Sequence, residues 1–492
     1  MRPDAYNIAT VASLKMHLQS DKQLARSPVS PLPSANQRPE LVRGLNVWHA
    51  TSIVAGTIIG SGIFLVPAEM MQAVGSAGLV YLAWIVGGLL SFFGALTYAE
   101  LGAVRPFSGG EYVYVRDAYG PLPGFLYGWT WFVIAKPASI ATVTAGMVRV
   151  LGTFHAFRFL PQTILGLHLT ASRTLDITYG HLVAIAATIL ITALNYVGVR
   201  KAGDFQFAFT VLKVGMIVGI AVVALTASSG SWSNFGTSFA GAKGGMAGFM
   251  AALVAALWAY DGWNDLNMVS EEIERPERSI PIALIAGVGL VAVLYMGMNA
   301  GIQRALPAAK IAQAAVPAAA ASEAALGPVG ITLVSIGMVI SMLATLNGTV
   351  MSGGRVPFAV ARDGYLWKAL GEVHRKFHTP ALALVIQAAT AILLVLIGGA
   401  FRELFSLAIF AEWLFYVVAA STIFVFRRKE AAGSFKMPGY PMVPALFIGT
   451  AAVLLYYTFV SNLRNSVVGL IVILAGIPVY FCFTHYRRQD RH

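Results

Sequence analysis

The stretch Val54-Ala-Gly-Thr-Ile-Ile-Gly-Ser-Gly-Ile-Phe64 places three glycines within seven positions, inside the first long apolar segment of the chain. Glycine weakens a helix by about 1 kcal/mol per residue relative to alanine. A helix opened inside hydrocarbon exposes unpaired N–H and C=O groups, so such breaks occur only where protein or a water-filled cavity surrounds them. We therefore interpret Gly60-Ser61-Gly62 as a break that lines a cavity near the middle of a membrane.

The composition of the chain excludes a soluble protein. Of 492 residues, 57% are hydrophobic and only 11% are charged, which is typical of a chain that crosses a membrane many times. The net charge of +12 does not by itself imply a nucleic-acid partner. Because Cys482 is the only cysteine, no internal disulfide can form.

Twelve apolar segments are candidate membrane spans, since a helix needs about 20 mostly apolar residues to cross a bilayer. They lie near 46–72, 78–102, 120–150, 179–199, 205–228, 245–272, 279–302, 329–354, 380–400, 404–426, 441–461 and 465–486. An alanine-rich stretch at 307–326 is too broken to span. We expect it to form a helical loop against the outer face.

The positions of the basic residues predict the orientation in the membrane. Most of the 34 Lys and Arg residues lie in segments that share a side with the N-terminus. Both termini are therefore expected in the cytoplasm, with the domain at 45–486 in the plasma or inner membrane and residues 487–492 as a cytoplasmic end. Residues 1–44 are polar and proline-containing, and they predict a disordered cytoplasmic tail rather than a signal peptide.

The sixth segment contains a second interruption. Its sequence, Leu257-Trp-Ala-Tyr-Asp-Gly-Trp-Asn-Asp-Leu-Asn-Met-Val-Ser-Glu-Glu272, places charges at membrane depth, where they face a cavity or a partner by default. The span could instead end at Tyr260, but 245–260 is then too short to cross alone. Paired interruptions in corresponding positions of two halves are typical of inverted-repeat transporters and indicate their binding site.

The two breaks offer complementary groups to a zwitterion. Free N–H groups at the start of a half-helix suit a carboxylate, whereas unwound carbonyl groups suit an ammonium group. An α-amino acid carries both charges close together. Two broken helices lying side by side therefore predict an amino acid site.

Several motifs follow one another at fitting spacing. They are Gly60-Ser-Gly-Ile-Phe64, Tyr98-Ala-Glu-Leu101, Ser108-Gly-Gly-Glu-Tyr112, Lys136-Pro137, Leu257 to Asn264 with Glu271-Glu272, Asn347-Gly348 and Trp413-Leu-Phe-Tyr416. With them, about residues 44–486 resemble the amino acid–polyamine–organocation superfamily and, within it, a prokaryotic-type member of the L-type amino acid transporter family.

The resemblance implies an all-α LeuT-type fold of twelve transmembrane helices, with helices 1 and 6 broken. Spans 1–5, at about 45–228, and spans 6–10, at about 245–426, would be inverted repeats. Two extra helices would follow at about 441–486.

The resemblance also implies a substrate site at the first break. The N–H groups of Ser61, Gly62 and Ile63, which follow Gly60, would hold the carboxylate of the substrate. The carbonyl of Ile58 would accept a hydrogen bond from its ammonium group.

The second break would complete that site. The carbonyl of Asp261 would accept from the same ammonium group, and its side chain would admit cationic substrates or simply cap the unwound segment. Trp258 would be an aromatic lid, with a packing aromatic as the alternative. Asn264 would shape the side-chain pocket or cap the second half-helix. Broad neutral amino acids are the favoured substrates, and cationic ones come second.

Lys213 lies inside the fifth span. It could snorkel to the inner surface. The resemblance implies instead that its ammonium group occupies the place of sodium in sodium-coupled relatives and bonds carbonyls of the first break. Ser341, Thr345 and Asn347 of the eighth span are possible partners. Sodium coupling is then not expected.

Glu412 departs from the pattern of the family, which has a small apolar residue in many members. It could be a proton-linked group. The alternative is a carboxylate that is hydrogen-bonded to a neighbouring helix, with Lys136 as a possible partner.

We expect a secondary transporter, a permease or exchanger of L-amino acids, that works by alternating access. A proton-coupled amino acid or polyamine transporter and a nutrient sensor are the alternatives. An enzyme is not expected, because the motifs His-Glu-x-x-His, Gly-x-Ser-x-Gly and Cys-x-x-Cys do not occur, and neither a cofactor nor a metal is expected.

The loop at about 153–178 has no cysteine, so no disulfide-linked heavy subunit is expected. The lipid bilayer and the amino acid are the expected partners, without nucleic acid.

Overall fold

The computed structural model describes residues 40–170, 173–397, 401–429, 434–461 and 463–489. Residues 41–492 cluster as one compact unit, which is the subject of all that follows. The predicted disordered tail lies almost entirely outside the described residues. The same holds for the last three residues of the predicted cytoplasmic end.

The first half of the unit consists of helices with one hairpin. Its elements are α2 (Val47–Ile58), α3 (Gly62–Val74), α4 (Ala77–Val104), α5 (Glu111–Tyr119), α6 (Pro121–Thr130), the π-helical turn η1 (Trp131–Ala135), α7 (Lys136–Leu151), η2 (His155–Phe157), β1 (Thr163–Thr170), β2 (Arg173–Thr178), α8 (Tyr179–Val197), α9 (Val199–Thr226) and η3 (Trp232–Gly236).

The second half is helical throughout its described residues. Its elements are α10 (Gly245–Ala259), α11 (Asp265–Met268), η4 (Ser270–Glu272), α12 (Pro276–Ala305), α13 (Ala308–Gln313), α14 (Pro317–Leu326), α15 (Pro328–Gly353), α16 (Arg355–Arg362), η5 (Lys368–Gly371), α17 (Ala381–Ile397), α18 (Phe401–Lys429), α19 (Met442–Ser461) and α20 (Leu463–Gln489).

The described helices identify a protein that crosses a membrane many times. Nine helical stretches of the described residues are long and apolar enough to span a bilayer, and two shorter apolar helices, α10 and α17, accompany them. Each apolar segment predicted from the sequence contains a helix. The chain is therefore a polytopic helical membrane protein.

The first predicted break is present. Helix α2 ends at Ile58, α3 begins at Gly62, and Ile59 has a non-helical ψ of 84°. Asn46 starts α2 with a capping box, in which its side chain accepts from the backbone N–H of His49 and the His49 ring accepts from the backbone N–H of Asn46.

The second predicted break is present and lies against the first. Helix α10 ends at Ala259, and α11 begins only at Asp265. Between them Gly262 has φ of +106°, a conformation that favours glycine. A Cβ on Gly262 would lie 3.0 Å from Cγ2 of Thr57. The two breaks therefore touch through their backbones.

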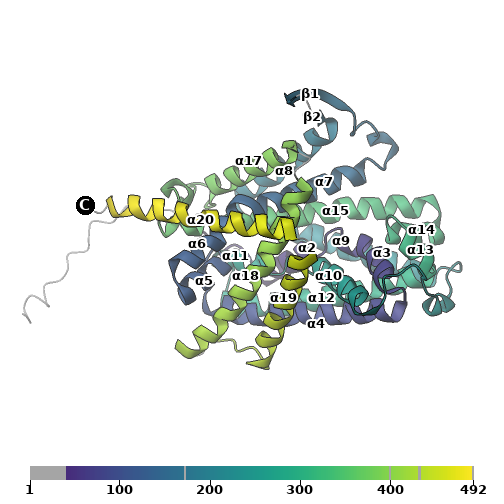
Figure 1. Cartoon of the computed structure of the whole chain (residues 1–492). Helices are drawn as coiled ribbons and strands as arrows, with labels where there is room; N and C mark the ends of the chain where they lie inside the picture. Colours follow the sequence, from purple (N-terminus) through teal and green to yellow (C-terminus); the bar gives the residue numbers. More distant parts are fainter. Residues whose placement is uncertain (1–39, 171–172, 398–400, 430–433, 462, 490–492) are drawn as a thin grey trace, which may run out of the picture. The chain divides into compact units, whose positions relative to one another are not determined.

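Half-helices α3 and α10 pack on one group of helices, and α7 belongs to a second group. Helix α3 packs on α10, α13 and α14, and α10 also packs on α4. Helix α7 packs on α15, α17 and α8 (Figure 1). Half-helix α2 packs on α12, α9 and α15, so it connects the two sets.

Two connections show how far the sequence predicts the loops. The alanine-rich stretch does form two short helices, α13 and α14, which pack against α3 and α15. The purely α-helical fold needs a correction, because β1 and β2 pair antiparallel between α7 and α8. Residues 163–170 alternate apolar and small or polar side chains in part, a pattern of period two that suits a strand and not a helix.

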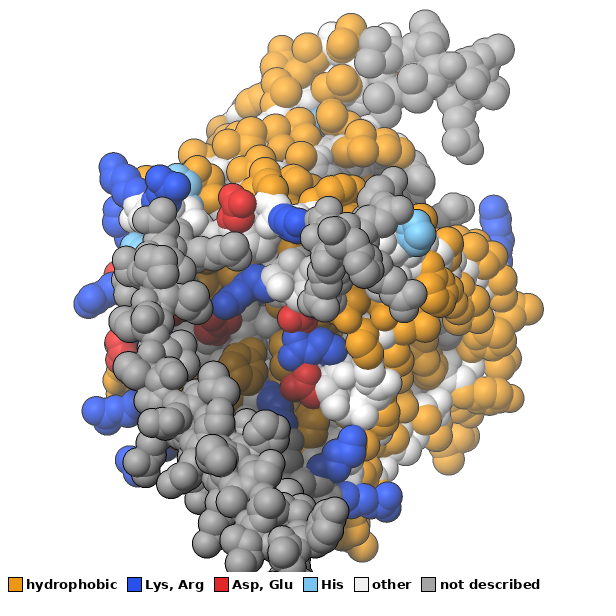
Figure 2. Space-filling model, turned by 90° about the vertical axis from the view of Figure 1, so that its left-hand side faces the viewer, with side chains coloured by type: hydrophobic (Ala, Val, Ile, Leu, Met, Phe, Trp, Pro, Cys, Tyr) orange, Lys and Arg blue, Asp and Glu red, His pale blue; other side chains and the backbone are white. Residues whose placement is uncertain are grey.

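Basic side chains gather on one face of the molecule. Figure 2 shows this face, which lies on the side of α5 and α6 in Figure 1, and it carries many Lys and Arg side chains.

Candidate substrate site

Lys213 reaches the carbonyl groups that the first break exposes. Its side chain is 1% exposed, and Nζ donates to the carbonyl oxygens of Gly56 at 2.6 Å and Ile59 at 2.7 Å. It also lies 3.3 Å from the carbonyl oxygen of Ser341 on α15. The expected contact between Lys213 and the break is thus present, and Lys213 does not snorkel to the surface.

Two hydroxyl groups of α15 reach the same carbonyls. Ser341 donates to the carbonyl of Ile59 at 2.6 Å, and Thr345 lies 3.2 Å from the carbonyls of Gly56 and Ile59. Ser341 also lies 3.1 Å from the carbonyl of Gly60. Donors from α9 and α15 thereby satisfy the carbonyl end of α2 and fix the shape of the break.

Asn347 does not join this group. Its side chain donates to the carbonyl of Ala202 at 3.0 Å and to Oε1 of Gln206 at 2.8 Å, and it accepts from Asn195 at 2.8 Å. The prediction that Asn347 helps Lys213 at the break is therefore wrong. Asn347 instead joins α15 to α8 and α9, because it lies on α15 where these helices meet.

The start of α3 presents backbone donors. The first N–H groups of a helix have no acceptor within it, and here these groups belong to Ser61, Gly62 and Ile63. The helix dipole adds partial positive charge at the same end. Ser61 and Gly60 are part-exposed, whereas Ile63 is fully buried. The N-terminus of α3 can hold an anionic group such as a carboxylate.

Helix α10 lies close above this N-terminus. A Cβ on Gly62 would be 3.1 Å from both Cα and Cβ of Ala259 and 3.5 Å from Cζ3 of Trp258. Trp258 is 37% exposed although an aromatic ring of this size in a helix bundle is usually buried. Its place beside Gly62 agrees with a ring at the mouth of the break.

Tyr295 of α12 joins the two breaks. Its hydroxyl lies 3.2 Å from the carbonyl oxygen of Ile58 and 2.9 Å from that of Ala259. These two carbonyls end α2 and α10. The carbonyl of Ile58 accepts from the N–H of Gly60 at 2.8 Å. The Tyr295 hydroxyl has one hydrogen, and when it donates to Ala259 the second lone pair of the Ile58 carbonyl is open to a ligand.

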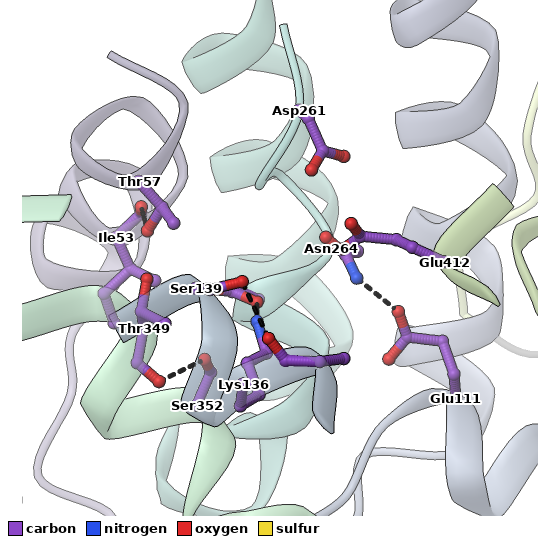
Figure 3. A network of polar contacts seen from close by, with 12 residues as sticks. Ile53, Thr57, Glu111, Lys136, Ser139, Asp261, Asn264, Thr349, Ser352 and Glu412 are labelled. Carbon is purple, nitrogen blue, oxygen red and sulfur yellow. Dashed lines mark hydrogen bonds and ion pairs between the residues drawn. The ribbon is translucent and has the colours of Figure 1, made fainter. Parts of the chain in front are cut away.

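Side chains from three elements meet at the second break. Asp261 and Glu412 reach toward Asn264 from the break and from α18, and the Asn264 amide donates to Glu111 of α5 (Figure 3). The hydroxyl of Tyr416 lies 2.7 Å from Oδ1 of Asp261 and 3.0 Å from Oδ1 of Asn264. Both Asp261 and Glu412 are part-exposed.

The capping role considered for Asn264 is not observed, whereas the Asp261 side chain has a hydrogen bond with the backbone of Gly262 in the unwound segment. Asn264 occupies the N-cap position of α11 without a capping hydrogen bond from its side chain, since Glu111 and Tyr416 use both ends of its amide. The carboxylate of Asp261 accepts from Tyr416.

Lys136 forms a buried ion pair with Asp265. The two side chains are 8% and 1% exposed, and they connect α7 to α11. Lys136 is thus bonded to Asp265 and not to Glu412, as was considered from the sequence. The sequence of residues 257–272 does not show which of its carboxylates faces α7.

Glu111 lies beneath the second break. Its side chain is fully buried, and Oε1 accepts from Asn264 at 2.7 Å. Burial raises the pKa of Glu111 to about 7. In the sequence, Glu111 stands out only as part of the Ser108–Tyr112 motif, where a carboxylate directly follows two glycines.

Two ion pairs hold the segment that follows α11. Arg355 is fully buried and holds Glu272 through two hydrogen bonds of 2.7 and 3.0 Å. Arg362 bonds Glu271 at 3.0 Å. Residue Leu45, just before α2, pairs with Ile273 as a parallel β-bridge. These contacts join α16 and the residue before α2 to the segment that follows α11.

Comparison with known proteins agrees with this geometry. The sequence model of the amino acid permease family matches residues 45–482. The chain belongs to the amino acid permease family. It is a membrane transporter and not an enzyme.

Similar proteins cover nearly the whole permease. The human b(0,+)-type amino acid transporter 1 is 31% identical over 453 residues, which are 91% of this chain and 89% of the relative. The serine/threonine exchanger SteT of Bacillus subtilis (strain 168) is 31% identical over 457 residues, 90% of this chain and 97% of the relative. The human cystine/glutamate transporter is 30% identical over 463 residues, 93% and 89% of the two chains.

Proposed function

We propose that this permease exchanges L-amino acids across the cell membrane by alternating access and without sodium. The observation that carries the proposal is the contact of the two breaks at Thr57 and Gly262, with free N–H groups on one and unwound carbonyls on both. Such a pair of breaks near the middle of the membrane is the arrangement expected for the substrate site of an inverted-repeat transporter.

The amino acid binds between the two breaks. Its carboxylate accepts from the N–H groups of Ser61, Gly62 and Ile63, since a helix N-terminus favours an anion. Its ammonium group donates to the carbonyls of Ile58 and Asp261. Trp258, which is 37% exposed beside Gly62, closes over the occupied site.

Lys213 takes the place that a coupling sodium ion would need. Its ammonium group already bonds the carbonyls of Gly56 and Ile59, so a second cation there would meet a fixed positive charge. A permanent internal cation of this kind makes transport independent of sodium.

The fold that supports this cycle is LeuT-type, with twelve spans. Residues 45–486 form the transporter domain, the repeats are about 45–228 and 245–426, and the two extra helices lie at about 441–486. The face in Figure 2 is the cytoplasmic one, because basic residues are enriched on the cytoplasmic side of membrane proteins. Both termini then lie in the cytoplasm of a plasma or inner membrane.

Broad neutral amino acids are the favoured substrates, and cationic ones come second. Asp261 and Glu412 are part-exposed carboxyl groups near the pocket, and the names of the relatives include a b(0,+)-type transporter and a serine/threonine exchanger. Cys482 is exposed and is the sole cysteine, so a disulfide-linked heavy subunit at the α7–α8 connection is not part of the proposal.

Uptake of isotope-labelled amino acids into proteoliposomes tests the proposal. Labelled serine, leucine and lysine are offered outside, with and without the same unlabelled amino acid inside. An exchanger takes up label only when the vesicles contain substrate. Equal uptake into empty vesicles would identify a uniporter, and binding without any uptake would identify a sensor.

A further inference from the structure

The hydroxyl group of Tyr416 faces more acceptors than it can serve. It lies 2.7 Å from Oδ1 of Asp261, 3.0 Å from Oδ1 of Asn264 and 3.4 Å from Oε1 of Glu412. The orientation of Asn264 follows from its other end, where Nδ2 donates to Glu111 at 2.7 Å. All three neighbours of Tyr416 are therefore oxygen atoms.

A count of hydrogens follows from this geometry. A tyrosine hydroxyl has one hydrogen to donate, and its oxygen can accept from others. If Asp261 and Glu412 are both ionised, two of the three oxygens face a lone pair of Tyr416 without a hydrogen between them. A single proton on either carboxyl group supplies one of these two missing hydrogens, because a protonated carboxyl group can donate to Tyr416.

The surrounding charges point the same way. The titratable and polar groups that face the pair from neighbouring elements are Lys136 of α7, Asp265 of α11, Glu111 of α5, Tyr98 of α4 and Tyr416 of α18. Lys136, the cation of this set, is already paired with Asp265. Two carboxylates that share one site cannot both ionise easily without a cation between them.

We propose that Asp261 and Glu412 together bind one proton with each neutral amino acid and carry it through the transport cycle. The proposal rests on the proposed function, since it adds a second ligand to the same site. The proton comes from water on the open side, forms an O–H bond with one carboxylate, and returns to water on the other side when the amino acid leaves. A carboxylate is regenerated, so charge and atoms balance over the cycle.

The part-exposure of both carboxyl groups makes this exchange with water possible. Asp261 and Glu412 are each partly accessible, whereas Asn264, Asp265 and Glu111 beneath them are buried. The pair is therefore more accessible than the buried groups around it, so a proton from water can reach it.

The affinity for L-serine, measured with purified full-length protein in detergent at several pH values between 5 and 8, tests the proposal. If binding requires the protonated pair, the Kd of serine rises by about tenfold per pH unit above the pKa of the pair. In Glu412→Gln the amide donates to Tyr416 in place of the proton, so the Kd is expected to stay constant. Glu323→Gln, an exposed carboxyl group on α14, is the matched control and should keep the wild-type slope.

A second measurement keeps the test decisive should Glu412→Gln fail to fold. Serine is added to the wild-type protein in weakly buffered solution, with a pH indicator, near the pH at which the Kd begins to rise. We expect uptake of up to one proton per serine bound. A Kd that is constant with pH and no proton uptake would overturn the proposal while leaving amino acid transport intact. If no amino acid binds at any pH, the proposed function itself fails.

Discussion

Gly62 begins α3 beside the end of α10. A Cβ there would lie 3.1 Å from Cα and Cβ of Ala259, which is closer than most such contacts, and it would crowd the N–H groups proposed for the carboxylate. Overpacking of this kind costs about 1–3 kcal/mol. Gly62→Val is therefore expected to weaken amino acid binding by at least about tenfold.

Gly78→Val is the control for that substitution, since no atom lies within 4 Å of the Cβ position of Gly78. Binding is measured with labelled amino acid on purified protein of equal monodispersity. Normal binding by a well-folded Gly62→Val protein would rule out the carboxylate site at α3.

Trp258 is expected to act on transport more than on folding. The ring is partly exposed beside the first break, at 37%, so Trp258→Ala leaves the fully buried core intact. It should lower the transport rate per molecule several-fold, because the occupied site no longer closes. Trp48→Ala, whose ring is 67% exposed on α2, is the matched control. If the yield of Trp258→Ala falls but the rate per molecule stays constant, Trp258 is a packing residue.

Glu111 predicts a pH dependence of stability. Burial raises its pKa from 4.5 to about 7, so its protonated form is favoured in the folded state. Its contribution to stability is fully present below about pH 4.5 and is lost as the pH rises through about 7. The shift corresponds to a free energy on the order of 3 kcal/mol.

Thermal unfolding in detergent at pH 5.5 and pH 8 measures this effect. The wild-type protein should lose more stability between the two pH values than Glu111→Gln, whose neutral amide keeps a hydrogen-bond partner for Asn264. Glu323→Gln should behave like the wild type. An identical pH dependence in the wild type and Glu111→Gln would show that Glu111 keeps its charge in the folded protein.

At the scale of helices, Lys213 joins three elements. Its ammonium group bonds carbonyls at the end of α2 and one on α15, from its own position on α9. Loss of the ammonium group leaves buried carbonyls without a donor, at about 1–3 kcal/mol per group. This is enough to shift the balance between inward and outward conformations.

Lys213→Ala should therefore lower the exchange rate more than the affinity for substrate. The comparison uses labelled uptake for the rate and equilibrium binding for the affinity, with Lys243→Ala, an exposed lysine, as the control. Full turnover of Lys213→Ala would contradict the role given to this ammonium group.

The breaks in α2–α3 and α10–α11 were predictable because their cause is local. Glycines and charges within an apolar run weaken a helix wherever it packs. Gly60-Ser61-Gly62 supplies glycines, and Asp261-Gly262 supplies a charge and a glycine. The resemblance to a family predicted that Lys213 bonds carbonyls of the break near Gly56 and Gly60, and in the structure the bonded carbonyls are those of Gly56 and Ile59.

The pairing of side chains between distant helices was not predictable. Asn264 bonds Glu111, and Lys136 bonds Asp265 instead of Glu412. These choices depend on the rotation and depth of each helix, which a single sequence does not determine. Asn347 was misplaced for the same reason, because it faces Gln206 and Asn195 and not the break.

At the scale of the whole molecule, the two sides of the site differ. The segment after α11 is held by the buried pair of Arg355 and Glu272 and by the β-bridge of Leu45 with Ile273, whereas Trp258 at the end of α10 is partly exposed. Alternating access then requires these pairs to open while α3 and α10 close. In the proposed cycle the free energy for this change comes from the substrate, which we propose binds both breaks at once.

The central claim is that the two breaks bind an amino acid and that Lys213 replaces sodium. Its most direct test is exchange of labelled L-serine in proteoliposomes loaded with unlabelled serine, measured in sodium buffer and again with choline in place of sodium. We predict the same initial rate in both buffers. A rate that falls steeply when choline replaces sodium would contradict the account.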